Sequence, residues 1–398
     1  MIYLDNAATS WPKPEAVYRT MDSFLREKGA NPGRSGHTMA VAAEKVVEET
    51  RVLLARLLNA ADEKDIIFTL NCTDSLNLSL KGLLKPGDHV ITSSISHNSL
   101  TRPLRKLEQR GVRVTRLLPC SEEGFLSPQD IEQAIGPNTR LIAVTHASNV
   151  SGVIQPIEEF GEVAKRHDIA LLVDAAQSVG TLPIDVQATN VDLLAFAGHK
   201  GLLGPTGTGG LYISKRVQPE PLKEGGTGTF SESEEQPSDR PHMYESGTPN
   251  TVGIAALGEG LRYLMSRTLA DIRTHKKTLL DRLLDGLAAI PGITVYGPKD
   301  RARRLSVAPF NIEGWSPDEV GAVLDQAFDI KVRTGLHCAP AAHKVLGTYP
   351  HGSVRASVGC FNTPDEIDFL LSALKKIADT EPPRLAADKT QSSSMSAH

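Results

Sequence analysis

The sequence predicts an α/β protein with a large domain, built on a mainly parallel sheet with helices on both faces, and a smaller α+β domain. Short β-rich apolar runs alternate with amphipathic segments of helix length up to about residue 213. Beyond about residue 290, strand-like and helix-like segments follow in a mixed order. The length of 398 residues, 40% of them apolar, is enough for two domains with buried cores.

Seven short apolar runs are the candidate strands of the large domain. They lie at 65–69, 89–93, 112–117, 141–145, 170–173, 193–196 and 210–213. The clearest helix is expected at 38–58, and further helices at 74–83, 99–110, 127–134 and 157–166. Because parallel neighbours need crossover connections, this alternation predicts right-handed β/α units that cover both faces of the sheet.

The second part of the chain begins with an irregular segment. Residues 217–250 are rich in Gly, Glu, Ser and Pro and show no apolar period, and such long loops are often functional. One helical stretch is expected from 251 to about 290. Shorter elements then follow, strand-like at 293–296, 306–310 and 354–358 and helix-like at 317–327 and 364–378.

These patterns predict a large domain at 15–260 and a small domain formed by 1–14 and 261–379. The last residues, 380–398, have few apolar groups and no periodicity, so a disordered tail is expected. No apolar run approaches the ~20 residues of a membrane span, and the N-terminus lacks the pattern of a signal peptide. We therefore expect a cytoplasmic protein with no membrane partner.

Charge and cysteine content exclude other classes. Lys and Arg number 43 against 47 Asp and Glu, a net charge of −4, so nucleic acid is not an expected partner. The four cysteines, at 72, 120, 338 and 360, are too few for a disulfide framework and are expected to be free thiols. The residues around Cys338 lack the spacing of a zinc site, so no metal is expected.

Polar residues follow four of the candidate strands. His97, Asn149, the pair Asp174 and Gln177, and the pair His199 and Lys200 each come shortly after a strand ends. Ligands of open parallel sheets bind beyond the carboxyl ends of the strands. Any one of these residues alone could be a helix cap or a surface group, but together they predict one shared site.

This set of residues suits pyridoxal phosphate. Lys200 can form the Schiff base, Asp174 can keep the pyridine nitrogen protonated, and His97 can cover the ring. For the phosphate, residues 71–74 lie where a strand runs into a helix, so backbone N–H groups and the Thr73 hydroxyl can bind the anion. A plain helix cap at Thr73 or Asp74 is the alternative, and both interpretations can hold together.

Six motifs resemble, in order, those of the cysteine desulfurase and selenocysteine lyase family of the class V aminotransferase superfamily. They are YLDNAAT at 3–9, VDAAQSVG at 173–180, AGHKGLLGPTGTGGLYI at 197–213, ESGTPN at 245–250, VRTGLHCA at 332–339 and VRASVGCFNT at 354–363. The resemblance runs to about residue 379, and the short loop with Cys338 five residues after Arg333 is similar to the group II, Suf-like branch. It implies the fold of type I pyridoxal phosphate enzymes.

The resemblance also implies a role for each cofactor residue. Lys200 would bear the cofactor, Asp174 would pair with the pyridinium, Gln177 would hydrogen-bond the ring hydroxyl, and His97 would stack on the ring. The phosphate residues are then expected to be Thr73 and His199 of one subunit and Thr248 of its neighbour, which implies a homodimer.

The substrate residues follow from the same resemblance. Asn149 and Arg355 would bind the substrate carboxylate, Arg355 through a bidentate fork that Lys cannot reproduce. Cys338 would take the sulfur, with His337 and His97 as candidates for moving protons. Arg34 is expected near the substrate or the partner subunit.

The sequence departs from the family at two cofactor positions. Cys72 stands in the phosphate loop where Thr is common, and Ala197 stands where Ser is common, so two hydroxyls that could bind the phosphate are missing. For Cys72, Cys120 and Cys360 we expect the role of a small buried side chain.

The predicted function is that of a pyridoxal-phosphate-dependent cysteine desulfurase, which converts L-cysteine to L-alanine with transfer of sulfur to Cys338, and a sulfur-acceptor protein is a candidate partner. The alternatives are a selenocysteine lyase acting on L-selenocysteine, a cysteine β-lyase, an aminotransferase on another amino acid, or a binding protein that retains the fold.

Overall fold

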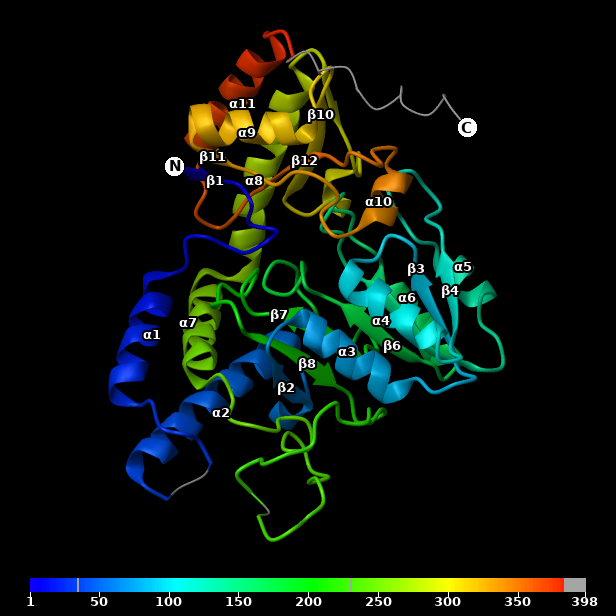
Figure 1. The fold of residues 1–398 in the computed structure, drawn as a ribbon, viewed down its shortest axis with the longest axis vertical. Helices are drawn as coiled ribbons and strands as arrows, with labels where there is room; N and C mark the ends of the chain where they lie inside the picture. Colours follow the sequence, from blue (N-terminus) through cyan, green and yellow to red (C-terminus); the bar gives the residue numbers. More distant parts are fainter. Residues whose placement is uncertain (34–35, 230, 383–398) are drawn as a thin grey trace, which may run out of the picture.

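The computed structural model describes residues 1–33, 36–229 and 231–382. The expectations for Arg34 and for a tail beyond residue 382 therefore lie outside the described residues. Figure 1 shows two parts, which we call the large layer and the small layer. The large layer, in the lower part of the view, is a twisted sheet together with its helices. The small layer above it is a smaller group of strands and helices, and the long helix α8 joins the two. Within the described ranges, no helix is both long and apolar enough to cross a membrane.

The large layer contains a seven-stranded sheet, which confirms the predicted mainly parallel architecture. Its strand order is β2-β8-β7-β6-β5-β3-β4, and β8 alone runs antiparallel to both of its neighbours. The strands are β2 (Ile66–Thr69), β3 (His89–Ser93), β4 (Arg113–Leu117), β5 (Thr139–Thr145), β6 (Ala170–Asp174), β7 (Leu193–Ala197) and β8 (Gly209–Ile213).

Helices pack on both faces of this sheet because successive strand residues point to opposite sides. Ile66, Ile91 and Ile142 share one core with α2 (Thr38–Leu58), α6 (Ile157–Arg166) and α7 (Thr251–Arg267). Their chain neighbours Ile67, Val90 and Leu141 share the opposite core with α3 (Cys72–Leu83) and α4 (Asn98–Glu108). The outer helix α1 (Glu15–Glu27) packs against α7, and the short α5 (Pro128–Gln133) against α6.

The small layer has a core of its own. Its antiparallel sheet has three strands: β9 (Ile293–Val295), β10 (Val307–Ile312) and β12 (Val354–Ser357). Their order in the sheet is β12-β10-β9. Beside them β1 (Ile2–Tyr3) pairs in parallel with β11 (Ile330–Lys331). The helices of this layer are α8 (Leu269–Ala288), α9 (Pro317–Phe328) and α11 (Pro364–Ala378). The short α10 (Pro340–Val345) instead packs against Ile95, Phe125 and Val153 of the large layer.

The two ends of the chain thus meet in the small layer, since Leu4 lies in the same core as Ile367 and Leu374. The domain boundaries near residues 14 and 260 stay predictions.

The expected single helix at 251–290 is wrong, because Thr268 adopts a left-handed φ of 60° and caps α8 by accepting a hydrogen bond from the Asp271 backbone N–H at 3.2 Å. The described residues between 217 and 250 contain no helix or strand, as their composition predicts.

Candidate active site

A cavity of about 210 Å³ lies beyond the carboxyl ends of the parallel strands, where the sequence predicts its site. All of the residues predicted to bind the cofactor or the substrate carboxylate line it except Arg355 and Thr248, and the predicted Cys338 and His337 do not line it either. The lining residues are Ala8, Asn71, Cys72, Thr73, His97, Ser99, Thr145, Ala147, Asn149, Asp174, Ala176, Gln177, Ala197, His199 and Lys200.

Asp174 and Lys200 occupy the floor of this cavity. Asp174 ends β6 and is 3% exposed, and its Oδ1 accepts a hydrogen bond from the Ala176 backbone N–H at 3.1 Å. Lys200 follows β7, and its Nζ makes no hydrogen bond or salt bridge with any described residue. Burial lowers the pKa of Lys200, although Cys72 and Asp174 oppose this shift. A lysine whose neutral form is favoured can act as a nucleophile and a base.

Cys72 belongs to this floor, and its thiol points at the carboxylate. Its Sγ donates to Asp174 Oδ1 at 3.4 Å, and burial together with this carboxylate raises the pKa of Cys72 well above its usual value. The thiol therefore stays protonated.

Cys72 is buried as expected, and Cys360 is half-buried, whereas Cys120 is exposed, so its expected burial is wrong. All four cysteines are free, as predicted.

Two helix N-termini meet at one end of the cavity. Asn71 caps α3 by accepting from the Asp74 backbone N–H at 3.0 Å, and His97 caps α4 by accepting from the Ser99 backbone N–H at 3.1 Å. The Ser99 hydroxyl joins the two helices, since it lies 2.8 Å from both Thr73 Oγ1 and His97 Nδ1. Backbone N–H groups and the positive ends of two helix dipoles make this end suitable for a phosphate.

The capping contact also fixes the state of His97. Because Nδ1 accepts from the Ser99 backbone, the ring hydrogen of neutral His97 is on Nε2. Burial lowers the pKa of His97, with Lys200 and Arg333 acting in the same direction and Asp174 opposing. His97 is therefore both a helix cap and a neutral ring beside the predicted cofactor position.

Unpartnered polar atoms in the lining provide a test of whether the residues fit pyridoxal phosphate. Thr145 Oγ1 and His199 Nδ1 are buried, and neither has a hydrogen-bond partner among the described residues. Burial lowers the pKa of His199 to about 4, so the ring is neutral. Buried polar groups are normally paired. Together with the unpaired Lys200 amine and the charged Asp174 carboxylate, they fit a polar phosphate-bearing ring.

Residues 5–13, which we call the N-terminal strap, cross the cavity between the two layers. The Gln177 Nε2 donates to the Ala7 carbonyl at 2.9 Å. The His199 carbonyl accepts from Thr9 Oγ1 at 3.0 Å and from Lys13 Nζ at 2.8 Å. Burial lowers the pKa of Lys13 to about 8. The strap thereby fixes the segment that carries Lys200.

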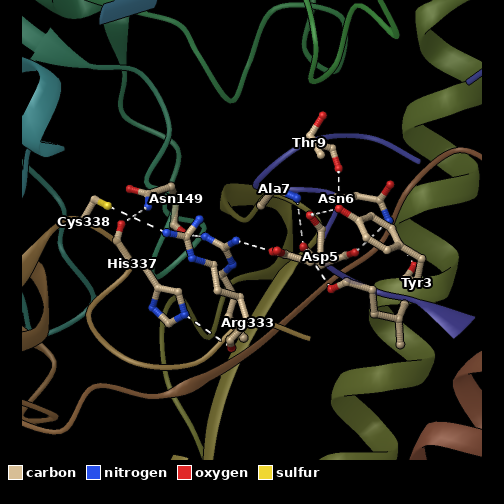
Figure 2. Close-up of polar contacts among 12 residues, drawn as sticks. Tyr3, Asp5, Asn6, Ala7, Thr9, Asn149, Arg333, His337 and Cys338 are labelled. Atoms are coloured by element: carbon tan, nitrogen blue, oxygen red, sulfur yellow. Dashed lines mark hydrogen bonds and ion pairs between the residues drawn. The ribbon is translucent and has the colours of Figure 1, made fainter. Parts of the chain in front are cut away.

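The predicted carboxylate-binding residues contact each other. Arg355, on β12, is 1% exposed; its Nη1 donates to the Asn149 carbonyl at 2.9 Å and its Nη2 to Asp5 Oδ1 at 2.6 Å. The Asn149 side chain donates in turn to the His337 carbonyl at 2.7 Å, as Figure 2 shows. Arg355 Nε is buried and has no hydrogen-bond partner among the described residues, so it is one of the donors that remain for a substrate carboxylate.

Cys338 lies on a strained turn at the mouth of the site. Its side chain is exposed, and its Sγ lies 3.8 Å from Arg333 Nη2. His337 and Cys338 have left-handed φ values of 49° and 57°, which cost roughly 1–2 kcal/mol each for residues other than Gly. The Asn98 backbone N–H donates to the Cys338 carbonyl at 2.9 Å. Because Asn98 follows His97, this bond brings the turn to the cavity.

The structure turns His337 away from the thiol (Figure 2). Its Nδ1 lies 3.2 Å from His343 Nε2 and its Nε2 lies 3.5 Å from the Arg333 carbonyl. Burial, with Arg355 and His343 acting in the same direction, lowers the pKa of His337 to about 2. Of the two candidates for moving protons at Cys338, His97 is therefore the one whose ring faces the cavity.

Thr248 lines a separate cavity with Phe68, Asp74 and Leu222. Its predicted contribution to a neighbouring subunit stays a prediction.

Sequence reasoning missed three contributors. Ser99, which joins the two helix N-termini, carried no signal beyond its position two residues after His97. Asp5 and Arg333 lie inside the quoted motifs at 3–9 and 332–339, but nothing in the sequence indicates that they contact Arg355 and Cys338.

Comparisons with known proteins identify the family of the chain. The aminotransferase class V family model matches residues 2–370. A probable cysteine desulfurase from Methanothermobacter thermautotrophicus is 38% identical over 385 residues, which cover 95% of this chain and 94% of that protein. A cysteine desulfurase from Escherichia coli O127:H6 is 35% identical, with 95% of this chain and 93% of that protein covered.

Two solved structures share the fold. The apo cysteine desulfurase from Thermococcus onnurineus NA1 superposes with a TM-score of 0.88 at 35% identity, covering 95% of this chain and 94% of its own. The cysteine desulfurase CsdA (S-sulfonic acid) from Escherichia coli gives a TM-score of 0.83 at 29% identity, with 94% of each chain covered.

Proposed function

The chain belongs to the class V aminotransferase family, and from this premise we propose that it is a pyridoxal-phosphate-dependent cysteine desulfurase. It converts L-cysteine to L-alanine and transfers the sulfur to Cys338. The observation that carries the proposal is the exposed Cys338 thiol beside Arg333, on a turn bonded to Asn98 at the edge of the Lys200 cavity. An aminotransferase needs Lys200 and Asp174, whereas only sulfur transfer also needs such a thiol.

Pyridoxal phosphate, when bound, supplies the electron sink that makes the substrate Cα proton acidic. Lys200 would hold it covalently, Asp174 would face its ring nitrogen, and His97 would lie against its ring. The phosphate would be bound where α3 and α4 begin, by Thr73, by backbone N–H groups and by the unpartnered His199 ring. Cys72 would contribute to cofactor binding indirectly, through its hydrogen bond to Asp174.

Each protein group then has a chemical task. Arg355 and Asn149 orient the substrate carboxylate. The Lys200 amine, which burial keeps more easily neutral, takes the Cα proton and returns a proton to the product. The Cys338 thiolate attacks the substrate sulfur, forming an S–S bond as the C–S bond breaks. Arg333 Nη2 lies 3.8 Å from the Cys338 sulfur.

The overall reaction balances without any other reactant. Cysteine and the Cys338 thiol give alanine and a Cys338 persulfide, and the persulfide sulfur then passes to a thiol acceptor. We propose that this acceptor is a protein, because the exposed turn is open to a partner. The proposal has two further parts: a homodimer in which Thr248 reaches the neighbouring site, which rests on the resemblance, and a cytoplasmic location.

The test is a substrate panel on the protein loaded with pyridoxal phosphate. We expect alanine from L-cysteine in equal amount to the persulfide found on Cys338 by mass spectrometry. Pyruvate with free sulfide would instead identify a β-lyase, and amino-group transfer to a keto acid an aminotransferase. Faster turnover of L-selenocysteine than of L-cysteine would identify a selenocysteine lyase. Sedimentation of the loaded protein measures whether it is a dimer.

A further inference from the structure

A buried pair of histidines lies behind the Cys338 turn, and the chemistry above does not use it. His337 and His343 are 3% and 0% exposed, and their rings stack with centroids 5.3 Å apart. His337 directly precedes Cys338, whereas His343 lies in α10 and contacts Thr348. Neither ring faces the Lys200 cavity.

Three hydrogen bonds connect these residues in a chain. Thr348 Oγ1 lies 2.7 Å from His343 Nδ1, and His343 Nε2 lies 3.2 Å from His337 Nδ1. At the end of the chain, His337 Nε2 lies 3.5 Å from the Arg333 carbonyl. Figure 2 shows this last contact, with the His337 ring below the turn and the thiol above it.

The direction of each bond follows from the last one. A carbonyl can only accept, so His337 Nε2 carries a hydrogen and its Nδ1 is an acceptor. His343 must then donate from Nε2, which leaves its Nδ1 to accept from the Thr348 hydroxyl. The opposite arrangement would set the bare Nε2 of His337 against the Arg333 carbonyl.

These bond directions require both rings to be neutral. An added proton on His337 Nδ1 would set two N–H groups against each other across the 3.2 Å contact, and one on His343 Nδ1 would face the hydrogen that Thr348 donates. Burial lowers the pKa of His337 to about 2 and that of His343 to about 4, which agrees with this requirement. Such a pair holds fixed hydrogen bonds near neutral pH and does not exchange protons.

We propose that Thr348, His343 and His337 are positioning residues that hold the turn of Cys338 against Arg333, so that sulfur transfer depends on a histidine that touches neither substrate nor cofactor. The Asn149 side-chain amide and the Asn98 backbone N–H donate to the carbonyls of His337 and Cys338. Among the described residues, only the histidine chain holds the His337 ring, and it ends on Arg333, whose guanidinium reaches the sulfur. This inference rests on the proposed function, in which Cys338 is the sulfur acceptor.

Two amide substitutions separate the bond to His337 from the rest of the site. In His343→Gln the amide nitrogen can occupy the place of Nε2 and still donate to His337, whereas in His343→Asn the shorter amide can reach only Thr348. We expect the Asn variant to lose about 10-fold or more in the rate of persulfide formation and the Gln variant to stay within about 3-fold of the wild type.

The readouts distinguish positioning from general damage to the fold. Iodoacetamide alkylation of Cys338, followed by mass spectrometry on the full-length protein with and without pyridoxal phosphate, is expected to show the same order of variants. The cysteine concentration that half-saturates the change in visible absorbance is expected to be unchanged, because the carboxylate-binding residues are intact. His89→Asn is the matched control, since His89 is also buried and lies 2.8 Å from two hydroxyls, those of Thr139 and Thr115, far along the chain from Cys338.

Equal alkylation and persulfide rates in the Asn and Gln variants would overturn the proposal, and so would an equal loss in His89→Asn. If His343→Asn does not fold, Thr348→Val removes only the last hydroxyl, and an alkylation rate equal to that of the wild type would overturn the proposal. If the wild type forms no persulfide from cysteine, the proposed function fails, and the alkylation series still decides whether the chain positions Cys338.

Discussion

The two walls of the candidate active site are built in different ways. Asp174 ends β6, where backbone pairing with β5 and β7 sets its position. Lys200 lies three residues beyond the end of β7, which pairs with β6 and β8. Cys338 lies on an exposed turn with two consecutive left-handed residues, which side chains from other elements hold in place. The wall proposed to bind the cofactor is held mainly by the pairing of the sheet, and the wall proposed to take the sulfur is held by a few polar contacts.

This difference predicts that damage to the first wall stops every reaction and damage to the second stops sulfur transfer alone. The largest effect is expected for Lys200→Ala, which removes the amine that holds the cofactor and moves the proton. Turnover should fall by at least ~10³-fold, and the visible absorbance of the covalently bound cofactor should disappear. The surface variant Lys215→Ala should keep both, and an active Lys200→Ala protein would exclude the cofactor assignment.

The second wall is tested by Cys338→Ser, because a hydroxyl of nearly the same size is a poor nucleophile at neutral pH. We expect this variant to bind pyridoxal phosphate and to respond to cysteine in the visible spectrum, yet to form no protein persulfide. Cys120→Ser is the control, since Cys120 is also exposed. Release of sulfide from cysteine at the wild-type rate would instead support a β-lyase. Elimination from selenocysteine could survive the change because selenium is the better leaving group.

Asp174→Asn tests the charge on the first wall while keeping its shape. An amide cannot hold the pyridinium proton by charge, so we expect the cofactor to remain bound and the rate to fall about 10²–10³-fold. Stopped-flow measurement of the spectral change and of alanine formation checks both. Wild-type turnover in this variant would remove Asp174 from the site.

Arg355→Lys tests the boundary between the two walls, where Arg355 of β12 contacts Asp5 of the N-terminal strap. Lysine keeps the positive charge but cannot reproduce the planar fork, so the half-saturating cysteine concentration should rise about 10–100-fold with an unchanged cofactor spectrum. An unchanged concentration would show that another group binds the carboxylate.

The smallest expected effect concerns stability in acid. Burial lowers the pKa of His146 to about 4. Between pH 6.5 and 4 the unfolded chain therefore binds a proton that the folded chain does not, so stability falls as the pH falls. Replacing His146 by Gln should reduce the loss of unfolding free energy from pH 7 to pH 5 by about 1–2 kcal/mol. Guanidinium unfolding at pH 7 and at pH 5 measures this loss of free energy. An equal loss in the wild type and in the Gln variant would contradict the lowered pKa of His146.

The same contrast explains which features of the fold and of the candidate site could be predicted from the sequence. The strands and the residues after them could be predicted, because apolar runs report burial and a parallel sheet brings its strand ends together. The break at Thr268 could not, since one residue with a left-handed φ leaves the helical period intact on both sides. The contacts of Asp5 with Arg355 and of Arg333 with Cys338 depend on how the two layers pack, which no local pattern records.

The strap also has a consequence for the order in which the site is completed during synthesis. Asp5 is among the first residues made, yet its partners Arg355 and Ser357 are made about 350 positions later. A growing chain can form the sheet that carries Asp174 and Lys200 well before the carboxylate clamp exists. A ribosome-bound chain arrested before β12 would thus contain the residues proposed to bind the cofactor but lack the arginine proposed to bind the substrate carboxylate, so the proposed sulfur chemistry becomes available only when nearly the whole protein has been made.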